Sequence, residues 1–216
     1  MYLLDELREE HQRIEGVLGA LRGYVTHRIE GGVPGEAPLF MAFFRVYADG
    51  YHHAREEDVL FAALVEHAEL PSTRGPIAAL IADHEAMRAM LGELDPLLDA
   101  PLDDAAKARL RELSMAYSRA LSHHIDAENS VLLPECRERL RRVGVYELPS
   151  RAPTSREAEA CEDGDALIAR WPAQPDDDIV RGDGCAMCPS FGVSCEGVER
   201  EWWSESEWEE FPDHVG

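Results

Sequence analysis

Long apolar runs are absent from this sequence of 216 residues, since no stretch approaches the ~20 consecutive apolar residues of a membrane-spanning helix. The N-terminal segment MYLLDELREE carries acidic residues where a secretory signal peptide requires a basic region. Both absences argue against a membrane-inserted or exported protein. We therefore expect a soluble, cytoplasmic protein.

Positive charge is scarce, because 21 Lys and Arg stand against 43 Asp and Glu, for a formal net charge of −22. Residues 1–146 carry 16 Lys and Arg against 25 Asp and Glu (−9), and residues 147–216 carry 5 against 18 (−13). Such a chain repels nucleic-acid phosphates and anionic membrane surfaces. We expect neither nucleic acid nor membrane as a partner.

Cysteine is also sparse, and its count of five is odd. An odd count fits thiols that are kept reduced better than a disulfide framework. Hydrophobic residues nevertheless make up 45% of the chain, so at least one part should fold as a globule. The length allows one domain plus an appendage.

One phrase of sequence occurs twice. His124 and Glu128 are four residues apart in LSHHIDAENSVLLP, and His52 and Glu56 are four apart in HHAREEDVLF. Residues at this spacing lie one above the other on one face of a helix. Each phrase therefore presents an imidazole and a carboxylate to the same point.

The spacing of apolar residues predicts four helices, at about residues 3–29, 38–67, 73–98 and 104–142. The first and third carry single histidines, His11 in EHQRIE and His84 in ADHEAMR. Short connections predict an all-α fold, an up-down-up-down antiparallel four-helix bundle. At ~1.5 Å per residue, the four histidine elements fall at similar heights in such a bundle. Their side chains can therefore meet in one layer.

Neighbouring positions of the second helix are predicted to face different ways. His52 and Glu56 share a mostly apolar line and should point inward, whereas His53 and Glu57 share a polar line and should face water. We interpret His123 as a surface neighbour as well.

Residues at the start, in the middle and at the end of the fourth helix are predicted to shape it. Asp103 or Asp104 is a candidate N-cap. Pro134 is expected to kink the helix, and Gly144 is a candidate stop.

Isolated imidazoles and carboxylates are costly to bury, and a metal centre removes that cost. Four His and two Glu exceed the needs of one tetrahedral zinc, whereas two carboxylates on facing helices can bridge two ions. The mixed ligand set suits iron or manganese. The predicted metal ligands are His11, His52, Glu56, His84, His124 and Glu128. A hydrogen-bonded polar network is the alternative.

Two further residues lie near the predicted ligands along their helices. Glu15 follows His11 by four residues, and Tyr117 precedes His124 by two turns on the same face. Both are candidates to contact the ligands from behind. Plain core packing is the alternative for Tyr117.

Four segments, EHQRIE, HHAREEDVLF, ADHEAMR and HHIDAENSVLLP, together resemble the hemerythrin-like, or HHE, cation-binding domain over about residues 3–142. The resemblance implies a four-helix bundle around two iron ions with an oxygen or carboxylate bridge. It implies His11, His52, His84 and His124 as terminal ligands, and Glu56 and Glu128 as bridging carboxylates.

The sequence departs from the oxygen-carrying hemerythrins in two places. They have two His four apart on the third helix, where this chain has His84 and Arg88, and they end in His and Asp five apart, not His124 and Glu128. With fewer His, one iron should keep an open or water-filled position. The resemblance thus implies a protein that binds or senses O2, NO, peroxide or iron. The alternatives are a di-iron redox enzyme (peroxidase, NO-processing or iron–sulfur repair type) and an interaction module switched by the centre.

The composition changes near residue 147 to acids, Pro and small residues, which is typical of a linker or disordered segment. We expect a bundle at residues 1–146 and an acidic, mostly irregular C-terminal extension at 147–216. A zinc site in this extension would use Cys185 and Cys188 together with Cys161 and Cys195, or His214. A redox dithiol among these cysteines and a metal-free extension are the alternatives.

All four Trp of the chain also lie in the extension, at positions 171, 202, 203 and 208. This enrichment predicts that the extension docks on the bundle or on a protein partner. Cys136, on the fourth helix, is interpreted as structural.

Overall fold

The computed structural model describes residues 1–176, 179, 204 and 206. No strand occurs among these residues, and none of their helices is both long and apolar enough to cross a membrane. Up to residue 176 the helical elements join into five continuous stretches. They are α1 (Tyr2–Ile29); α2 (Ala37–Ala42), η1 (Phe43–His53), η2 (Glu56–Phe61) and α3 (Ala62–Ala68); α4 (Gly75–Leu98); α5 (Asp104–Ala127), η3 (Glu128–Leu132) and α6 (Leu133–Arg142); and α7 (Ser155–Arg170).

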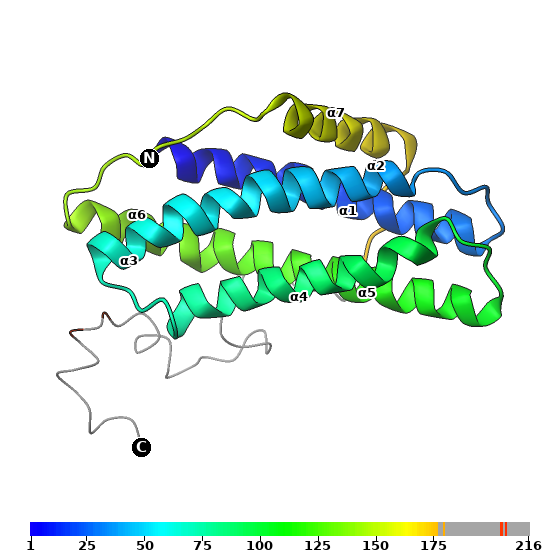
Figure 1. Cartoon of the computed structure of the whole chain (residues 1–216), viewed down its shortest axis with the longest axis horizontal. Coiled ribbons are helices and arrows are strands. Elements are labelled where there is room, and N and C mark those ends of the chain that lie inside the picture. Colours follow the sequence, from blue (N-terminus) through cyan, green and yellow to red (C-terminus); the bar gives the residue numbers. More distant parts are fainter. Residues whose placement is uncertain (177–178, 180–203, 205, 207–216) are drawn as a thin grey trace, which may run out of the picture.

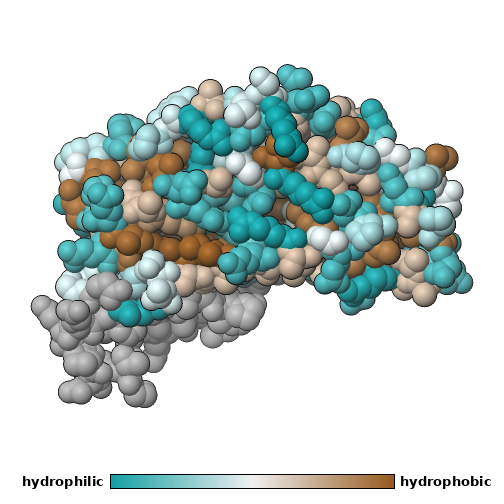
Figure 2. Space-filling model, in the orientation of Figure 1, coloured by the Kyte–Doolittle hydropathy of each residue, from teal (hydrophilic) through white to brown (hydrophobic). Residues whose placement is uncertain are grey.

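The long stretches lie side by side along the length of the molecule (Figure 1). Helix α5 packs against both α1 and α4, and α7 covers α1, α2 and η1. Figure 2 shows hydrophilic residues over much of the same face, with apolar residues between them. The first four stretches begin and end close to the predicted helices, because their apolar stripes are long and regular.

The apolar core is divided into two clusters along the helices. One contains Ile14, Met87 and Leu121, and the other contains Leu7, Leu80 and Leu132. His11, His52, His84 and His124 each lie between residues of the two clusters along their own helical stretch. The fold therefore places a polar layer between two apolar halves.

Three segments of the second and fourth stretches, η1, η2 and η3, are π-helical. They carry His52, Glu56 and Glu128, and π-helical turns are frequent at functional sites. Segment η3 directly precedes α6, whose second residue, Pro134, has no N–H to donate to the carbonyl of Ser130. The sequence predicted an interruption of the fourth helix at Pro134 but no π-helical segments, since apolar spacing does not report which carbonyl each N–H reaches. The kink at Pro134 stays a prediction.

Both predicted signals at the ends of the fourth stretch are confirmed. Asp103 caps α5 by accepting a hydrogen bond from the backbone N–H of Ala106 (2.8 Å). Gly144 follows the end of α6 with φ +83°, a left-handed conformation that glycine adopts without strain.

Helix α7 differs from the linker or disordered segment expected after residue 147. It begins with a capping box, in which Thr154 and Glu157 satisfy each other's backbone N–H groups. Ala160, Gly164 and Leu167 form a short buried stripe against the bundle. The sequence did not predict this helix, because its buried stripe has few apolar residues and the segment is rich in acidic ones. The boundary at residue 146 stays a prediction.

Candidate metal centre

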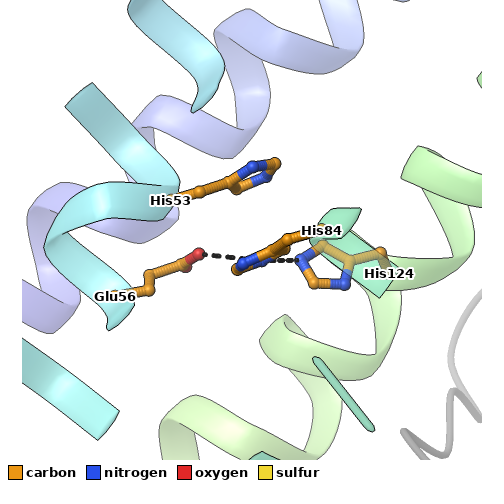
Figure 3. A group of neighbouring side chains, drawn as sticks. All are labelled: His53, Glu56, His84 and His124. Carbon is orange, nitrogen blue, oxygen red and sulfur yellow. Dashed lines mark hydrogen bonds and ion pairs between the residues drawn. The ribbon is translucent and has the colours of Figure 1, made fainter. Parts of the chain in front are cut away.

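The polar layer brings all six predicted ligands together in two overlapping groups. One group contains His11, His52, Glu56 and Glu128, and the other contains His53, Glu56, His84 and His124. Within each group the ligand atoms lie within 4.8 Å of one another. Each predicted ligand is at most 1% exposed. In Figure 3, His53 and Glu56 extend from one helical stretch toward His84 and His124.

The Glu56 carboxylate lies between two pairs of imidazoles. Its Oε1 atom is 3.4 Å from Nε2 of His52 and 3.9 Å from Nε2 of His11. We call His11 and His52 the first imidazole pair. Its Oε2 atom is 3.6 Å from Nε2 of His84, which with His124 forms the second imidazole pair.

Glu128 spans the same two pairs in a similar way. Its Oε2 atom is 3.1 Å from Nε2 of His11, and its Oε1 atom is 3.3 Å from Nε2 of His124. Each carboxylate therefore directs one oxygen to each imidazole pair. This is the arrangement that two bridging carboxylates require.

The four imidazoles are oriented by oxygen atoms behind them. In each, Nδ1 faces an amide or carboxylate oxygen: Asn129 for His11 (2.9 Å), Glu10 for His52 (2.8 Å), Glu57 for His84 (2.7 Å) and Asp83 for His124 (3.5 Å). The oxygens of Asn129, Glu10 and Glu57 accept a hydrogen bond from Nδ1, so Nε2 of His11, His52 and His84 presents a lone pair inward. The Asp83 oxygen lies at ion-pair distance from His124. Metal-binding histidines are commonly held in this way.

Several lone pairs in the centre accept no hydrogen bond from the described residues. Among the described residues, no oxygen of Glu56 or Glu128 accepts a hydrogen bond, and Nε2 of His11 has no hydrogen-bond partner, although Oε2 of Glu128 lies 3.1 Å from it. Nε2 of His84 and Nε2 of His124 are 3.0 Å apart. Two nitrogens about 2.1 Å from one ion, at right angles, would be about 3 Å apart. The residues thus fit a cation that accepts several lone pairs at once.

The electrostatics of the pocket favour a positive charge between its carboxylates. Burial, reinforced by Glu128, raises the pKa of Glu56 well above its ordinary value. At Glu128 itself the effect of burial is outweighed by His124 and His11, which hold its pKa well below the ordinary value. Burial is likewise outweighed at His124, where the Glu128 carboxylate raises the pKa to about 10. A metal cation can supply the charge that the imidazolium otherwise provides.

Two residues predicted to face water do not. His53 is buried and stacks on His84, with ring centroids 3.9 Å apart. Glu57 is partly buried and accepts the hydrogen bond from Nδ1 of His84. Both predictions were wrong because the polar line of this stretch faces α4, which supplies His84. His123 is also partly buried.

The remaining predicted residues belong to neither of the two overlapping groups. Tyr117 packs edge-on against Phe44 in the core, in keeping with the packing alternative. Glu15 is partly buried on α1, and its role stays a prediction. Cys136 is fully buried in the core.

The extension is described only in part. Cys161 lies partly buried on α7 beside Tyr47. Trp171 packs against Tyr24 and His27, with ring centroids 5.1 and 5.0 Å apart, so this part of the extension docks on the bundle. Cys185, Cys188, Cys195, His214 and Trp202, Trp203 and Trp208 lie outside the described residues.

Comparison with protein-family models matches residues 2–136 to the hemerythrin HHE cation-binding domain. No curated protein and no solved structure matches the chain. The matched segment contains α1 through the first residues of α6, and therefore every member of the two overlapping groups.

Proposed function

The chain belongs to the hemerythrin HHE cation-binding family, and from that premise we propose that it is a non-haem di-iron protein. Its centre binds or senses a small ligand, such as O2, NO or peroxide, or iron itself. The observation that carries this proposal is the position of Glu56 and Glu128, each of which faces both imidazole pairs. The short connections and the packing of α5 on α1 and α4 support an up-down-up-down antiparallel bundle around them.

In this proposal His11 and His52 would hold one ion, and His84 and His124 would hold the other. Glu56 and Glu128 would be shared between them. Bound iron supplies redox chemistry and coordination positions that a small ligand can occupy.

The protein contributes orientation and a dry environment. The oxygens behind the imidazoles direct each Nε2 inward, as the Glu10 carboxylate does for His52. The two apolar clusters on either side exclude water, which strengthens electrostatic interactions inside the layer. A cytoplasmic location and a protein partner for the extension remain part of the proposal.

The test is the metal content of the purified full-length chain, measured with its visible absorption spectrum. We expect two iron ions per chain and an absorption band that changes on addition of peroxide or NO. Glu56→Ala and Glu128→Ala should each lose at least one ion, since each removes an oxygen from both positions. Glu66→Ala, at an exposed position of α3, serves as the matched control. A wild-type chain that takes up no ferrous iron anaerobically would contradict the proposal.

A further inference from the structure

His53 is a buried imidazole that the proposed ligand set does not use. It is 4% exposed, and neither of its ring nitrogens has a hydrogen-bond partner among the described residues. Its ligand atom lies within 4.8 Å of those of Glu56, His84 and His124 (Figure 3). An unpaired polar ring is costly to bury. A group in the centre that binds a ring nitrogen of His53 would remove this cost.

His53 has a carboxylate behind its Nδ1 atom, as His52, His84 and His124 do, although this carboxylate comes from its own helical stretch. Its Nδ1 atom faces Oδ1 of Asp49, one turn earlier in the chain, at 3.5 Å. This is the distance that separates Nδ1 of His124 from Asp83. A carboxylate behind Nδ1 leaves Nε2 as the nitrogen available to a metal ion.

The residue pattern on α4 leaves room for a ligand from another helix. On two stretches a second ligand follows the histidine by four residues, at Glu56 and Glu128. On α4 that position is Arg88, which is always cationic and cannot bind a metal ion. The second imidazole pair therefore receives no further ligand from α4.

Arg88 instead organises the carboxylates behind His53 and His84. Its Nε atom donates to Oδ1 of Asp49 (2.7 Å), and its Nη2 atom donates to Oε1 of Glu57 (2.8 Å), which holds Nδ1 of His84. One guanidinium thus links the two imidazoles through their anchors. The carboxylates that face His53 and His84 are therefore held together by the same guanidinium.

We propose that His53 is a further metal ligand, which joins His84 and His124 as a third imidazole for the second ion. This inference rests on the proposed metal centre. The rings of His53 and His84 now lie 11° from parallel. Because a ring nitrogen binds an ion close to the ring plane, the two planes must open when they share an ion. The contact to Asp49 is long enough to permit this turn.

The test is an anaerobic titration of the full chain with Co²⁺, followed by absorption and by NMR. The wild type should bind two ions. His53→Ala and His53→Gln should weaken one of them by about tenfold or more, since even loss of a residue behind a ligand costs this much. The Co²⁺ absorption band should also change. His67→Ala, which removes an exposed histidine of α3, should alter neither property.

The wild-type NMR spectrum tests the same point without a variant. Five exchangeable, paramagnetically shifted imidazole N–H signals are expected, from the five histidines in the two groups. Four signals, together with unchanged Co²⁺ affinity in both His53 variants, would overturn the inference and leave the metal centre intact. Altered responses to NO with unchanged Co²⁺ affinity would also overturn it. A wild-type chain without bound Co²⁺ would instead contradict the metal centre itself.

Discussion

At the scale of single residues, Glu10 contacts a proposed ligand and a buried cation at the same time. It is 8% exposed, its Oε2 accepts from Nδ1 of His52 at 2.8 Å, and its Oε1 pairs with the buried Arg55. Burial raises the pKa of Glu10, and Arg55 opposes that rise. The carboxylate therefore both orients His52 and neutralises a buried guanidinium.

Glu10→Ala should weaken metal binding by about 10–100-fold, because His52 loses the acceptor that fixes its orientation. Competition with a chelator of known affinity measures this change. Glu9→Ala removes an exposed carboxylate one residue earlier and is the control. Equal affinities in the two variants would show that Glu10 does not control His52.

The same residue shows what the sequence could and could not predict about the site. Four of the six candidate ligands were predictable because a His and a Glu repeat at a spacing of four residues within one helix, and His11 and His84 because they fall at a similar height in a four-helix bundle. Glu10 stands beside His11 in the chain, yet it supports His52 on another helix. Contacts between helices, such as the one that buries His53 against His84, depend on how the stripes are rotated. Linear spacing contains no such information.

At the scale of elements, α7 depends on a close approach to η1. A Cβ atom at Gly164 would lie 2.3 Å from a ring carbon of Phe43 and 3.2 Å from a methyl carbon of Val17. Both neighbours belong to the packed core. A side chain at this position therefore requires either α7 or the core to shift.

Gly164→Ala should lower the free energy of unfolding by about 1–3 kcal/mol, the usual cost of overpacking a core. Urea unfolding monitored by tryptophan fluorescence measures the change. Gly92→Ala is the matched control, since nothing lies within 4 Å of a Cβ at this exposed helical position. That variant should gain about 0.5–1 kcal/mol, because alanine favours helix. Equal effects would contradict the close-packing account.

The start of α7 should be sensitive to acid. Two hydrogen bonds from Arg151, with help from Thr154, lower the pKa of Glu157 from 4.5 to about 2. A lowered pKa in the folded state stabilises the fold above pH 4.5, and this contribution is lost as the pH falls through about 2. The stability difference between wild type and Glu157→Gln should therefore be largest above pH 4.5 and shrink below it.

Urea unfolding at several pH values, with a chelator present, measures that difference. Glu159→Gln, an exposed position of the same helix, is the control. A difference independent of pH would show that the Glu157 charge does not contribute. Sequence reasoning missed α7 because its stripe depends on a glycine and an alanine, which carry little hydrophobic signal. It placed the longer helices well because their stripes contain many leucines.

At the scale of the whole molecule, the bundle carries two buried carboxylates midway between its apolar halves. Glu56 and Glu128 are both fully buried, and the pKa shift of Glu56 reflects burial and then the neighbouring Glu128 charge. Without a cation this layer opposes folding, and with one it links four helices. The stability of the fold and the occupancy of the centre should therefore be coupled.

The double variant Glu56→Gln with Glu128→Gln separates the two contributions. For the wild type, metal at 100 times its dissociation constant should raise the free energy of unfolding by about 2.7 kcal/mol, and a chelator should remove that gain. The double variant should show no such gain, because amides bridge metal ions poorly. With chelator present it should be at least as stable as the wild type, because it buries no charge. Thermal unfolding with and without ferrous iron measures both differences.

Glu66→Gln with Glu85→Gln, at two exposed positions, is the control and should keep the full response to metal. A double variant that remained metal-responsive would show that the two carboxylates are not the link between the helices.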